Sequence, residues 1–511
     1  MLESISLSLV FSTLAILATI HILIRFIIKP LSSVYYYSKQ GLKPTYIPIL
    51  GEWGQADKIA KQYGDAHHLL IKTLNADPNY IGSASPLGDR CTVFLTNIKH
   101  IKALLQNQAD NVIKHEKFIW PWKEYVTKTS ITFREGDDHK RLRRILAKSF
   151  HFDYLKRNIP SISKIAKEAF DDLEISGLND LHPLLEMGVI TGEVLGRTFF
   201  GFDHKKAFYR GKKITDAVFF VETEAPMLSQ TLLYQIFGQK LVKLQLTPYH
   251  KQTVSFFKGF REYCSTFVAK RKEELRADPS KANLDNLIDG LFLQQFEDEK
   301  NALSDPEILD QYIVFFLAGQ QTTAHWLTMI LYCLAKNPEY VEKIRNEIKT
   351  TIKDINNLDY NELVNMTYLN AVMKEVLRLY PPVHMFFFRE AIRDFQLCEL
   401  KIKKGTLLNI FLGHSAYKEN IFKNARNFDP TRWMDQGEGT NLPDPFCLIP
   451  FSAGDHSCIG QHMAWLQVRI ILIHLISRFN VSVPEDYKLI MTQRLAYEPL
   501  DFFNISLHRL K

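Results

Sequence analysis

The sequence predicts a mainly α-helical protein with small β-sheets, organised as one domain behind an N-terminal transmembrane helix. Helical apolar periodicity dominates the 511 residues, and a strand-rich stretch lies late in the chain at 383–416. Residues 5–24 contain no Asp, Glu, Lys or Arg and are long enough, as a helix, to cross a bilayer. Because no Gly/Ser linker, charge block or repeat interrupts the remainder, we expect a membrane anchor at 1–29, a proline-containing linker at 30–50 and a single domain at 51–511.

The charges that flank the apolar stretch predict its orientation. Glu3 is the only charged side chain before it, whereas Arg25 and Lys29 follow it directly. Since Lys and Arg gather on the cytoplasmic side of membrane helices, the body of the protein is expected to face the cytosol. A cleaved signal peptide is the alternative, although it would carry a basic segment before a shorter apolar core. Pro30 and Pro44 then predict a stiff, non-helical lead into the domain.

Cysteine usage and net charge limit the compartment and the kind of partner. The six cysteines lie apart, without any Cys-x-x-Cys pair, which fits a reducing compartment and argues against a disulfide framework or a structural zinc site. A formal net charge of +7 is modest for this length. It suits an acidic protein partner or an anionic membrane surface, and no nucleic-acid partner is expected.

The part of the chain that follows the linker predicts one short strand and then helices. A strand is predicted at 91–95, and the proline-containing aromatic stretch at 118–122 is expected to be a loop. Residues 135–146 begin acidic and continue basic, which is typical of a helix that complements its dipole. Residues 152–298 read mostly as amphipathic helix, whose large apolar surface could be either core or pocket.

A long helix is predicted to start at Ser304-Asp-Pro-Glu307, with a polar cap and a proline in its first turn. Either Ser304 or Asp305 could be the cap. The helix contains Gly319, which costs about 1 kcal/mol relative to alanine, and polar residues follow this glycine. Such a site often marks a local opening where a backbone carbonyl can bind water or a ligand.

Two further segments carry charge or sulfur in distinctive surroundings. Glu375 and Arg378 lie at i and i+3 on one helix face and can pair, although a bare pair of this kind contributes little. The stretch 383–416 alternates enough to form strands, with a turn at Lys404-Gly405. Residues 451–460 hold Cys458 between two glycines and before an apolar helical run, where a thiolate is favoured over a thiol.

The last of these stretches resembles the haem-binding signature of the cytochromes P450, Phe-x-x-Gly-x-Arg-x-Cys-x-Gly. Phe451, Gly454, Cys458 and Gly460 match it, and His456 stands where the family usually has arginine. The resemblance extends from about residue 40 to the C-terminus and implies a cytochrome P450 fold. It also implies haem b as cofactor, with the thiolate of Cys458 as the axial iron ligand.

The other segments match P450 motifs in the family's order. By resemblance, Arg143 and His139 stand at the Trp-x-x-x-Arg positions that reach a haem propionate, with His139 in place of tryptophan, and Arg389 stands where another propionate-binding arginine is common. Thr322, in the helix that contains Gly319, would hold water and a proton for the iron-bound oxygen. Gln321 occupies the usual acid position, and an amide does not exchange a proton at neutral pH as a carboxylate does.

The resemblance implies a supporting role for three charged residues. Glu375, Arg378 and Arg432 correspond to the family's buried structural cluster, and we interpret them as support for the fold and the haem loop. They are not expected to be catalytic.

The function implied is that of a haem-thiolate monooxygenase that inserts one atom of O2 into a hydrophobic, lipid-like or xenobiotic substrate. No Gly-x-Gly-x-x-Gly or P-loop motif is present, so electrons are expected from a separate reductase of the NADPH–cytochrome P450 reductase type. The expected location is the endoplasmic reticulum membrane, with a single pass and a cytosolic catalytic domain. Three alternatives stay open: a P450-fold peroxide isomerase or dehydratase that needs no reductase, a non-catalytic haem-binding sensor, and a helical scaffold without haem.

Overall fold

The structure is a computed structural model that describes residues 7–44, 56–68, 79–82, 91–385, 388–434, 437 and 441–510. The chain divides into two compact units. The first comprises Met1–His115, Met385–His414 and Met491–Gln493, and the second comprises Glu116–His384, Ser415–Ile490 and Arg494–Lys511. The mainly helical fold with small sheets is confirmed, whereas the boundaries assigned to anchor, linker and domain stay predictions.

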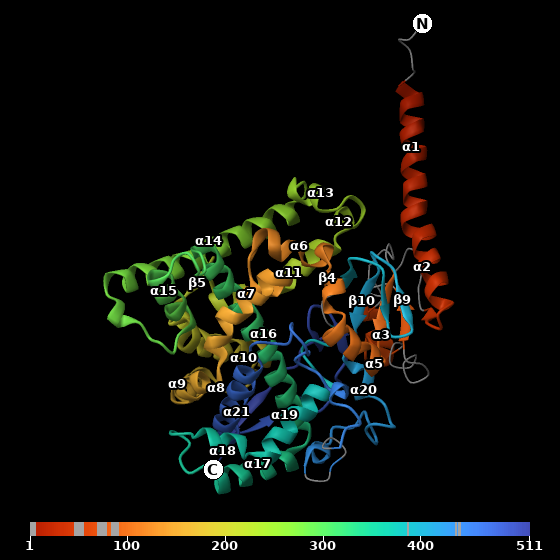
Figure 1. Cartoon of the computed structure of the whole chain (residues 1–511). Coiled ribbons are helices and arrows are strands. Elements are labelled where there is room, and N and C mark those ends of the chain that lie inside the picture. Colours follow the sequence, from red (N-terminus) through yellow and green to blue (C-terminus); the bar gives the residue numbers. More distant parts are fainter. Residues whose placement is uncertain are drawn as a thin grey trace. The chain divides into compact units, whose positions relative to one another are not determined.

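The first unit begins with a helical rod made of α1 (Leu7–Leu23), a π-helical turn (Ile24–Ile28) and α2 (Lys29–Ser38). Figure 1 shows the rod in red, with α2 beside β9 (Leu400–Ile402). In the described part of the chain, one helix is long and apolar enough to cross a membrane, and it spans Val10–Ser38. The expected non-helical lead at its C-terminal end is wrong over Lys29–Ser38, because the wider π-helical turn just before Pro30 accommodates the proline ring within a continuing helix.

A six-stranded sheet forms the centre of the first unit. The strand order is β1-β2-β3-β10-β7-β4, with β1–β2 and β3–β10 parallel and the remaining neighbours antiparallel. Its strands are β1 (Lys43–Pro44), β2 (Asn79–Gly82), β3 (Thr92–Leu95), β4 (Val112–Lys114), β7 (Arg389–Ala391) and β10 (Leu407–Ile410). The strands predicted at 91–95 and within 383–416 are therefore confirmed, and β8 (Phe395–Leu397) and β9 add a separate hairpin.

Two short helices pack within the first unit, α3 (Ala56–Tyr63) and α5 (Ile98–Lys102). The chain returns to this unit late, where β12 (Met491–Gln493) contacts α3. Thr492 donates its hydroxyl to Asp57 Oδ1 at 2.7 Å, which fixes this return. Residues more than four hundred positions apart in the sequence thus share one unit.

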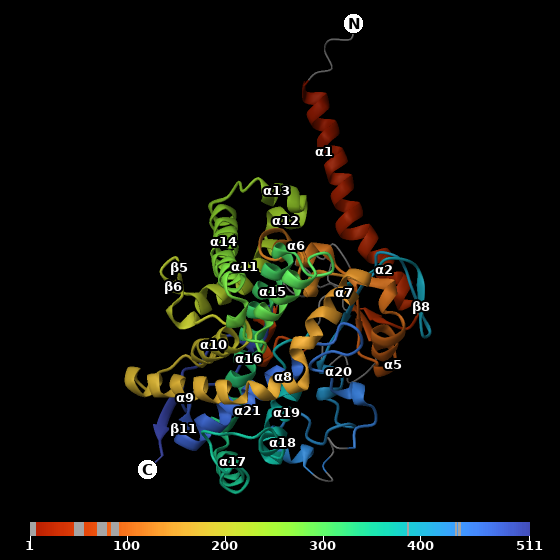
Figure 2. The ribbon, with the colours of Figure 1, turned by 60° about the vertical axis from the view of Figure 1, so that its left-hand side comes forward.

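The second unit is predominantly helical, with α16 at its centre. Figures 1 and 2 show α16 beside α10, and Figure 2 shows α9 crossing α21. Its longer helices are α6 (Glu116–Tyr125), α7 (Gly136–Ala147), α9 (Ile159–Ser176), α10 (Pro183–Val194), α11 (Ile214–Gln230), α14 (Pro248–Ala277), α15 (Leu287–Glu297), α16 (Asp305–Lys336), α17 (Pro338–Thr351), α19 (Thr367–Leu379) and α21 (Gln461–Arg478). Shorter helices are α8 (Phe152–Arg157), α12 (Leu232–Phe237), α13 (Gln239–Lys243) and α18 (Tyr360–Val364), and α20 (Gly413–Ala416) lies where the two units join in sequence.

Short strands complete the described part of the second unit. They are β5 (Phe208–Tyr209), β6 (Lys212–Lys213), β11 (Phe479–Ser482), β13 (Tyr497–Pro499) and β14 (Ser506–Arg509). β11 and β14 pair antiparallel directly after α21, and α16 contacts β11. The C-terminal strands thus pack close to the central helix.

The stretch at 118–122 forms part of α6, so its prediction as a loop is wrong. Pro121 lies inside this helix and cannot donate to the carbonyl of Lys117, four residues earlier. That carbonyl instead accepts the Tyr234 hydroxyl at 2.7 Å. A tertiary hydrogen bond thus replaces the one that proline removes.

The start of α16 agrees with the sequence and decides between the two possible caps. Ser304 is the N-cap, and its backbone N–H donates to Glu307 Oε2 at 2.9 Å. Asp305 is the first helical residue, and proline follows it in the first turn. The helix spans 32 residues, which confirms the long helix predicted here.

Candidate functional site

The loop that carries Cys458 closes on itself before α21 begins. The Cys458 backbone N–H donates to the Phe451 carbonyl at 2.8 Å, and the Ser457 N–H donates to the Gly454 carbonyl at 3.0 Å. Gly454 has φ of +71°, in the left-handed region that favours glycine. A turn of this shape holds the cysteine in one position at the entrance to the helix.

The thiol of Cys458 lies deep in the second unit and is nevertheless accessible. Burial raises its pKa, while the Gly460 backbone N–H and the positive charge of Arg143 act in the opposite direction. Its residue is exposed, unlike Cys264, Cys333 and Cys447, which are buried. An accessible thiol is what a ligand to a large bound group requires.

Arg143 reaches the loop from α7. Its Nη1 donates to the Ser457 carbonyl at 2.5 Å and its Nη2 donates to Ser457 Oγ at 3.1 Å. Burial lowers the pKa of Arg143, and the proximity of Cys458 and Asp455 opposes that shift. The guanidinium therefore places a positive charge beside the residue that precedes the thiol.

The two histidines at signature positions contact each other. The rings of His139, on α7, and His456, in the loop, have centroids 3.9 Å apart at an angle of 31°. His456 Nε2 also lies 3.3 Å from Glu135 Oε2. The sequence indicated the two histidines as separate replacements and did not indicate Glu135. Glu135 and His456 lie far apart in the sequence, so no local spacing predicts their contact.

Helix α16 opens onto space along one short stretch. Between Asp310 and Leu331 every residue is buried except Ala318, Gly319 and Thr322. The Thr322 hydroxyl donates to the Ala318 carbonyl at 2.7 Å. Gly319 and Thr322 therefore lie on the accessible stretch within Asp310–Leu331, whereas Gln321 is buried.

Gly319 packs closely against the side chain of Leu195. A Cβ at this residue would lie 2.9 Å from Leu195 Cδ1, on the π-helical turn Leu195–Phe200 that follows α10. An alanine at this position would therefore require the end of the flexible Leu195 side chain to shift. The glycine, which costs helix stability, allows Leu195 to pack directly against the backbone of α16.

The two consecutive glutamines of α16 differ in their surroundings. Gln320 points away from the open stretch, and its Nε2 donates to the Thr215 carbonyl on α11 at 3.0 Å. Gln321 is 7% exposed, and its main-chain carbonyl contacts Nδ1 of His325 at 2.9 Å. His325 is a polar residue of the site region that the sequence did not indicate.

Aromatic side chains join the Cys458 loop to α16. Trp326 of α16 packs edge-on against Phe451 at 6.1 Å and against Trp465 of α21 at 4.9 Å. Phe315, also on α16, lies 5.2 Å from Phe150, whose ring edge borders Gly460. The loop and the open stretch of α16 are therefore held by shared neighbours within one unit.

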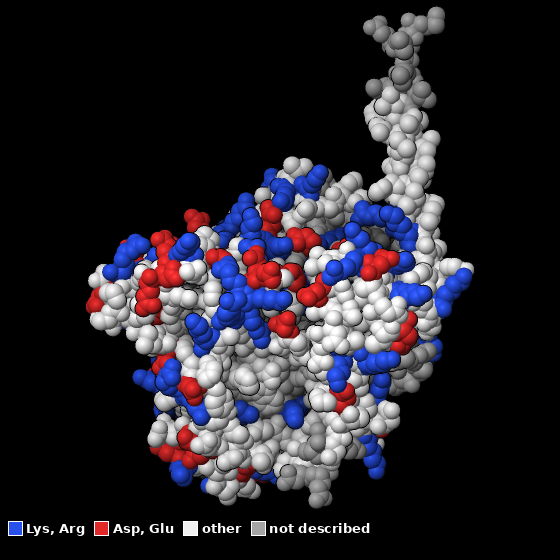
Figure 3. All heavy atoms as spheres, in the orientation of Figure 1, with Lys and Arg blue, Asp and Glu red and all other residues white. Residues whose placement is uncertain are grey.

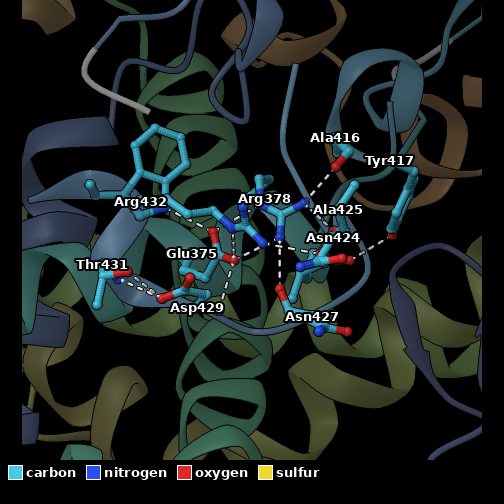
Figure 4. Close-up of polar contacts among 12 residues, drawn as sticks. Glu375, Arg378, Ala416, Tyr417, Asn424, Ala425, Asn427, Asp429, Thr431 and Arg432 are labelled. Atoms are coloured by element: carbon cyan, nitrogen blue, oxygen red, sulfur yellow. Dashed lines mark hydrogen bonds and ion pairs between the residues drawn. The ribbon is translucent and has the colours of Figure 1, made fainter. Parts of the chain in front are cut away.

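The predicted charge cluster is fully assembled (Figure 4). Figure 4 shows Arg378 and Arg432 converging on Glu375. Arg378 donates to both carboxylate oxygens of Glu375, at 2.8 and 2.6 Å, and Arg432 Nε donates at 3.3 Å. Glu375 is 0% and Arg378 is 1% exposed, so the charges are paired inside the protein.

Further donors and acceptors complete this cluster. Trp433 Nε1 donates to Glu375 at 2.8 Å and the Asp429 N–H donates to it at 3.1 Å. Arg378 donates to three main-chain carbonyls, those of Ala416, Ala425 and Asn427. The sequence did not indicate Trp433 or these carbonyls. Every residue has a main-chain carbonyl, so the residue type does not reveal which carbonyl accepts a hydrogen bond.

Arg389 lies in the first unit. It belongs to β7, where it pairs with Leu408 of β10 and Lys114 of β4. Its side chain is half-buried. Its predicted contact with a haem propionate stays a prediction.

The residues of the second unit fit the haem that the Cys458 signature implies. An accessible thiol, an arginine beside it and a helix stretch with one hydroxyl provide an axial ligand, a donor for a carboxylate and room for a small oxygen species. No carboxylate accompanies Gln321 on the described open stretch of α16. This donor set suits a haem with a thiolate ligand.

Comparison with known proteins agrees with the site. The family model described as Cytochrome P450 matches residues 43–501. The chain is 26% identical to cytokinin hydroxylase of Arabidopsis thaliana over 452 residues, 85% of this chain and 83% of that protein. It is 27% identical to cytochrome P450 4F8 of Homo sapiens over 387 residues, 73% of this chain and 72% of that protein. A solved structure, retinoic acid bound cyanobacterial CYP120A1, superposes with a TM-score of 0.70 at 20% identity, over 92% of this chain and 99% of that one, and shows the same fold.

Proposed function

Since the chain belongs to the cytochrome P450 family and is a P450 monooxygenase, we propose that it inserts one oxygen atom of O2 into a hydrophobic, lipid-like or xenobiotic substrate and reduces the other to water. The observation that carries this proposal is the accessible thiol of Cys458, deep in the same unit as the open stretch of α16. A bound haem supplies the redox chemistry, and the thiolate donates electron density to its iron.

The haem is proposed to be haem b. Cys458 would ligate the iron, and Arg143, His139, His456 and Arg389 would donate to the propionates. Arg143 is supported by its place beside the loop, where its fork already bonds Ser457. His456 can also donate to a propionate, although an imidazole offers fewer donors than the arginine that the signature usually has.

Thr322 is proposed to bind water and hold a proton next to the reacting oxygen. Its hydroxyl already donates to the Ala318 carbonyl, so its lone pairs are directed to the open side for a second donor. Ala318 and Gly319 contribute only small apolar surface there. An open stretch with a single hydroxyl supports an apolar substrate, because it offers few partners for a polar one.

Electrons are proposed to come from a separate NADPH–cytochrome P450 reductase type of flavoprotein. Figure 3 shows Lys and Arg side chains gathered over the region of α7, which carries Lys140, Arg141 and Arg144. A pocket of about 470 Å³ also opens between α18, α19 and α21. All its lining residues are described, and they include Lys374, Arg469 and His462 but no Asp or Glu. Such a surface suits an acidic partner.

The role of the pocket's positive charge in reductase docking can be tested with two charge-reversal variants, one inside the pocket and one outside it. Lys374→Glu is expected to raise the KM for the reductase about fivefold at low salt and less at high salt, because it removes complementary charge. Lys300→Glu changes net charge equally at an exposed position outside the pocket and serves as control. An equal response of both variants would contradict docking at this pocket.

The electron source separates the proposal from its rival. A P450-fold peroxide isomerase or dehydratase is favoured by Gln321, which lacks the proton exchange that O2 reduction uses. Oxidation of a lipid substrate by the purified protein is expected to require NADPH and reductase. Equal turnover with a lipid hydroperoxide alone would overturn the monooxygenase proposal in favour of the rival.

The location proposed is the endoplasmic reticulum membrane, with a single pass and the catalytic part in the cytosol. The apolar helix at Val10–Ser38 and the basic residues that follow its most apolar part support this orientation. Protease treatment of sealed microsomes is expected to degrade the body of the protein. Full protection of the body would place it on the lumenal side.

A further inference from the structure

His325 is a buried residue that follows the open stretch of α16 on its C-terminal side. Ala318, Thr322 and His325 stand at i, i+4 and i+7, so they lie in one stripe along the helix. His325 follows Thr322 by three residues, a rise of about 4.5 Å. Helical side chains lean towards the N-terminus, so the imidazole of His325 covers the turn that holds Gln321 and Thr322.

His325 is connected to the protein surface through two further side chains. Its Nδ1 lies 2.9 Å from the Gln321 carbonyl, and its Nε2 lies 2.8 Å from Glu498 Oε2, on β13. The other oxygen of Glu498 accepts from Arg494 Nη1 at 3.2 Å. His325 is 3% and Glu498 9% exposed at the side chain, whereas Arg494 is 46% exposed. The three residues form a line from solvent to the turn of α16 that carries Thr322.

Hydrogen-bond chemistry fixes the protons in this line. A main-chain carbonyl only accepts, so Nδ1 of His325 must carry hydrogen. Nε2 and the carboxylate oxygen are then 2.8 Å apart, and two acceptors would repel at that distance. A second proton therefore lies between His325 and Glu498, either on the ring or on the carboxyl group.

From this geometry we infer that His325 and Glu498 relay protons to water beside Thr322, in place of the acid that Gln321 lacks. The inference rests on the proposed monooxygenase function, which consumes protons when O2 is reduced. Nδ1–H gives one proton to water, and the proton that lies between His325 and Glu498 stays on Nε2. The carboxylate regains a proton from solvent beside Arg494, and tautomeric exchange through water, in which Nε2 loses a proton and Nδ1 gains one, restores Nδ1–H. One proton enters and one leaves, and no electron moves.

A purely structural role makes different predictions from a relay. The His325–Glu498 contact also joins α16 to β13, so its loss could act through stability alone. Glu498→Gln keeps the size of the side chain and a hydrogen bond to Nε2 but removes the exchangeable proton. Thr328→Val is the control, because Thr328 is a buried residue of the same helix whose hydroxyl bonds only the Ala324 carbonyl, at 2.8 Å, among the described contacts.

The first test measures how reducing equivalents are used. With reductase and NADPH, Glu498→Gln is expected to release roughly tenfold more hydrogen peroxide per NADPH than wild type. The reason is that proton delivery to the water beside Thr322 is slower in the variant. Its carbon monoxide band and thermal midpoint should stay at wild-type values, and Glu498→Asp should recover part of the coupling. Thr328→Val should resemble wild type. Unchanged peroxide release in Glu498→Gln, or a rise in Thr328→Val as well, would overturn the relay.

The second test does not depend on turnover. In the reduced, carbon monoxide-bound protein with ¹⁵N-labelled histidine, His325→Asn identifies the resonances of His325. Hydrogen on Nδ1 is expected in wild type and in Glu498→Gln, with an Nε2 shift that differs between them. A wild-type ring without hydrogen on Nδ1, or an Nε2 shift that Glu498→Gln leaves unchanged, would overturn the inference. Failure of the wild type to oxidise any substrate would instead refute the proposed function and leave these resonances interpretable.

Discussion

The charge cluster around Glu375 and the loop around Cys458 lie in the same unit and are built in opposite ways. Glu375 is 0% exposed and receives hydrogen bonds from two arginines, one indole and one backbone N–H. Cys458 is exposed, and its neighbours His456 and Arg143 are only half-buried. The cluster is complete with the residues of the chain, whereas the loop leaves its central atom open to another molecule.

This difference shows how charge can be used for two purposes in one fold. Inside the cluster every charge has a partner, so removal of one member leaves others buried and unpaired, which is costly. In the loop, the thiol of Cys458 is accessible, and the positive charge of Arg143 lies beside it. The first arrangement stabilises the protein, and the second binds its cofactor.

The largest expected effect tests the open side of the comparison. Cys458→Ala is expected to abolish the red-shifted carbon monoxide band of the reduced protein completely, because no other thiolate would ligate the iron. Stability without haem should change little, since the side chain is small and accessible. A retained band in this variant would mean that another residue ligates the iron.

The closed side is tested by Arg378→Ala. The variant is expected to lose about 3–5 kcal/mol of unfolding free energy, because it leaves Glu375 buried without its main partner. Chemical denaturation measures this loss. Arg276→Ala is a matched control, since Arg276 pairs with Glu273 at the same i, i+3 spacing but with 61% and 69% exposure. Its loss should stay below about 0.5 kcal/mol, and similar losses in both variants would contradict the role of burial.

Glu193 on α10 is a buried carboxyl group without the hydrogen-bond partners that Glu375 has, so it tests the effect of burial alone. It is 5% exposed, its two carboxylate oxygens have no hydrogen-bond partner, and burial, with Asp203 nearby, raises its pKa to about 7. The folded state therefore holds the proton more tightly than the unfolded state, so this stabilisation is full below about pH 4.5 and is lost as pH rises through about 7. The contribution amounts to about 2 kcal/mol between pH 5 and 8.

Glu193→Gln should remove this slope. Unfolding free energies of wild type and variant, measured from pH 5 to 8, are expected to diverge as pH rises, with the variant more stable at the alkaline end. The difference between the two curves cancels the other titrating groups. Parallel curves would show that Glu193 finds a partner in solution.

The smallest effect is expected at His456. His456→Arg should keep haem content within about twofold of wild type, because arginine can still pair with Glu135 and donate to a propionate. Haem content is measured by absorbance against protein concentration. Marked loss of haem would show that the ring contact between His139 and His456 itself supports binding.

Much of the fold was predictable because local signals agreed with tertiary ones. Ser304 and the proline in the first turn mark the start of α16, and alternation marks the strands within 383–416. The errors fall on prolines inside helices. At Pro121 the Tyr234 hydroxyl supplies the missing hydrogen bond, and such a partner, far away in sequence, is not visible locally.

Site residues could be predicted where they belong to a short sequence motif. They could not be predicted where they depend on contacts between segments that are distant in the sequence. Cys458 and Thr322 are indicated by the resemblance of their segments to family motifs, and their roles stay predictions. Glu135 became visible only through its contact with His456, and Glu498 only through its contact with His325, 173 residues away. Main-chain acceptors such as the Gln321 carbonyl are likewise independent of residue type.

The helical rod at the N-terminus is built into the first unit. Tyr37 of α2 is 2% exposed, and its hydroxyl lies 2.6 Å from Thr406 Oγ1, while the Lys401 N–H donates to Gln40 Oε1 at 2.7 Å. Rod and sheet therefore move together. In a bilayer, a span longer than the hydrocarbon thickness adapts by tilting, and here that tilt would turn the six-stranded sheet with it. If the rod spans a membrane as proposed, the thickness of that membrane would set the angle between this sheet and the lipid surface.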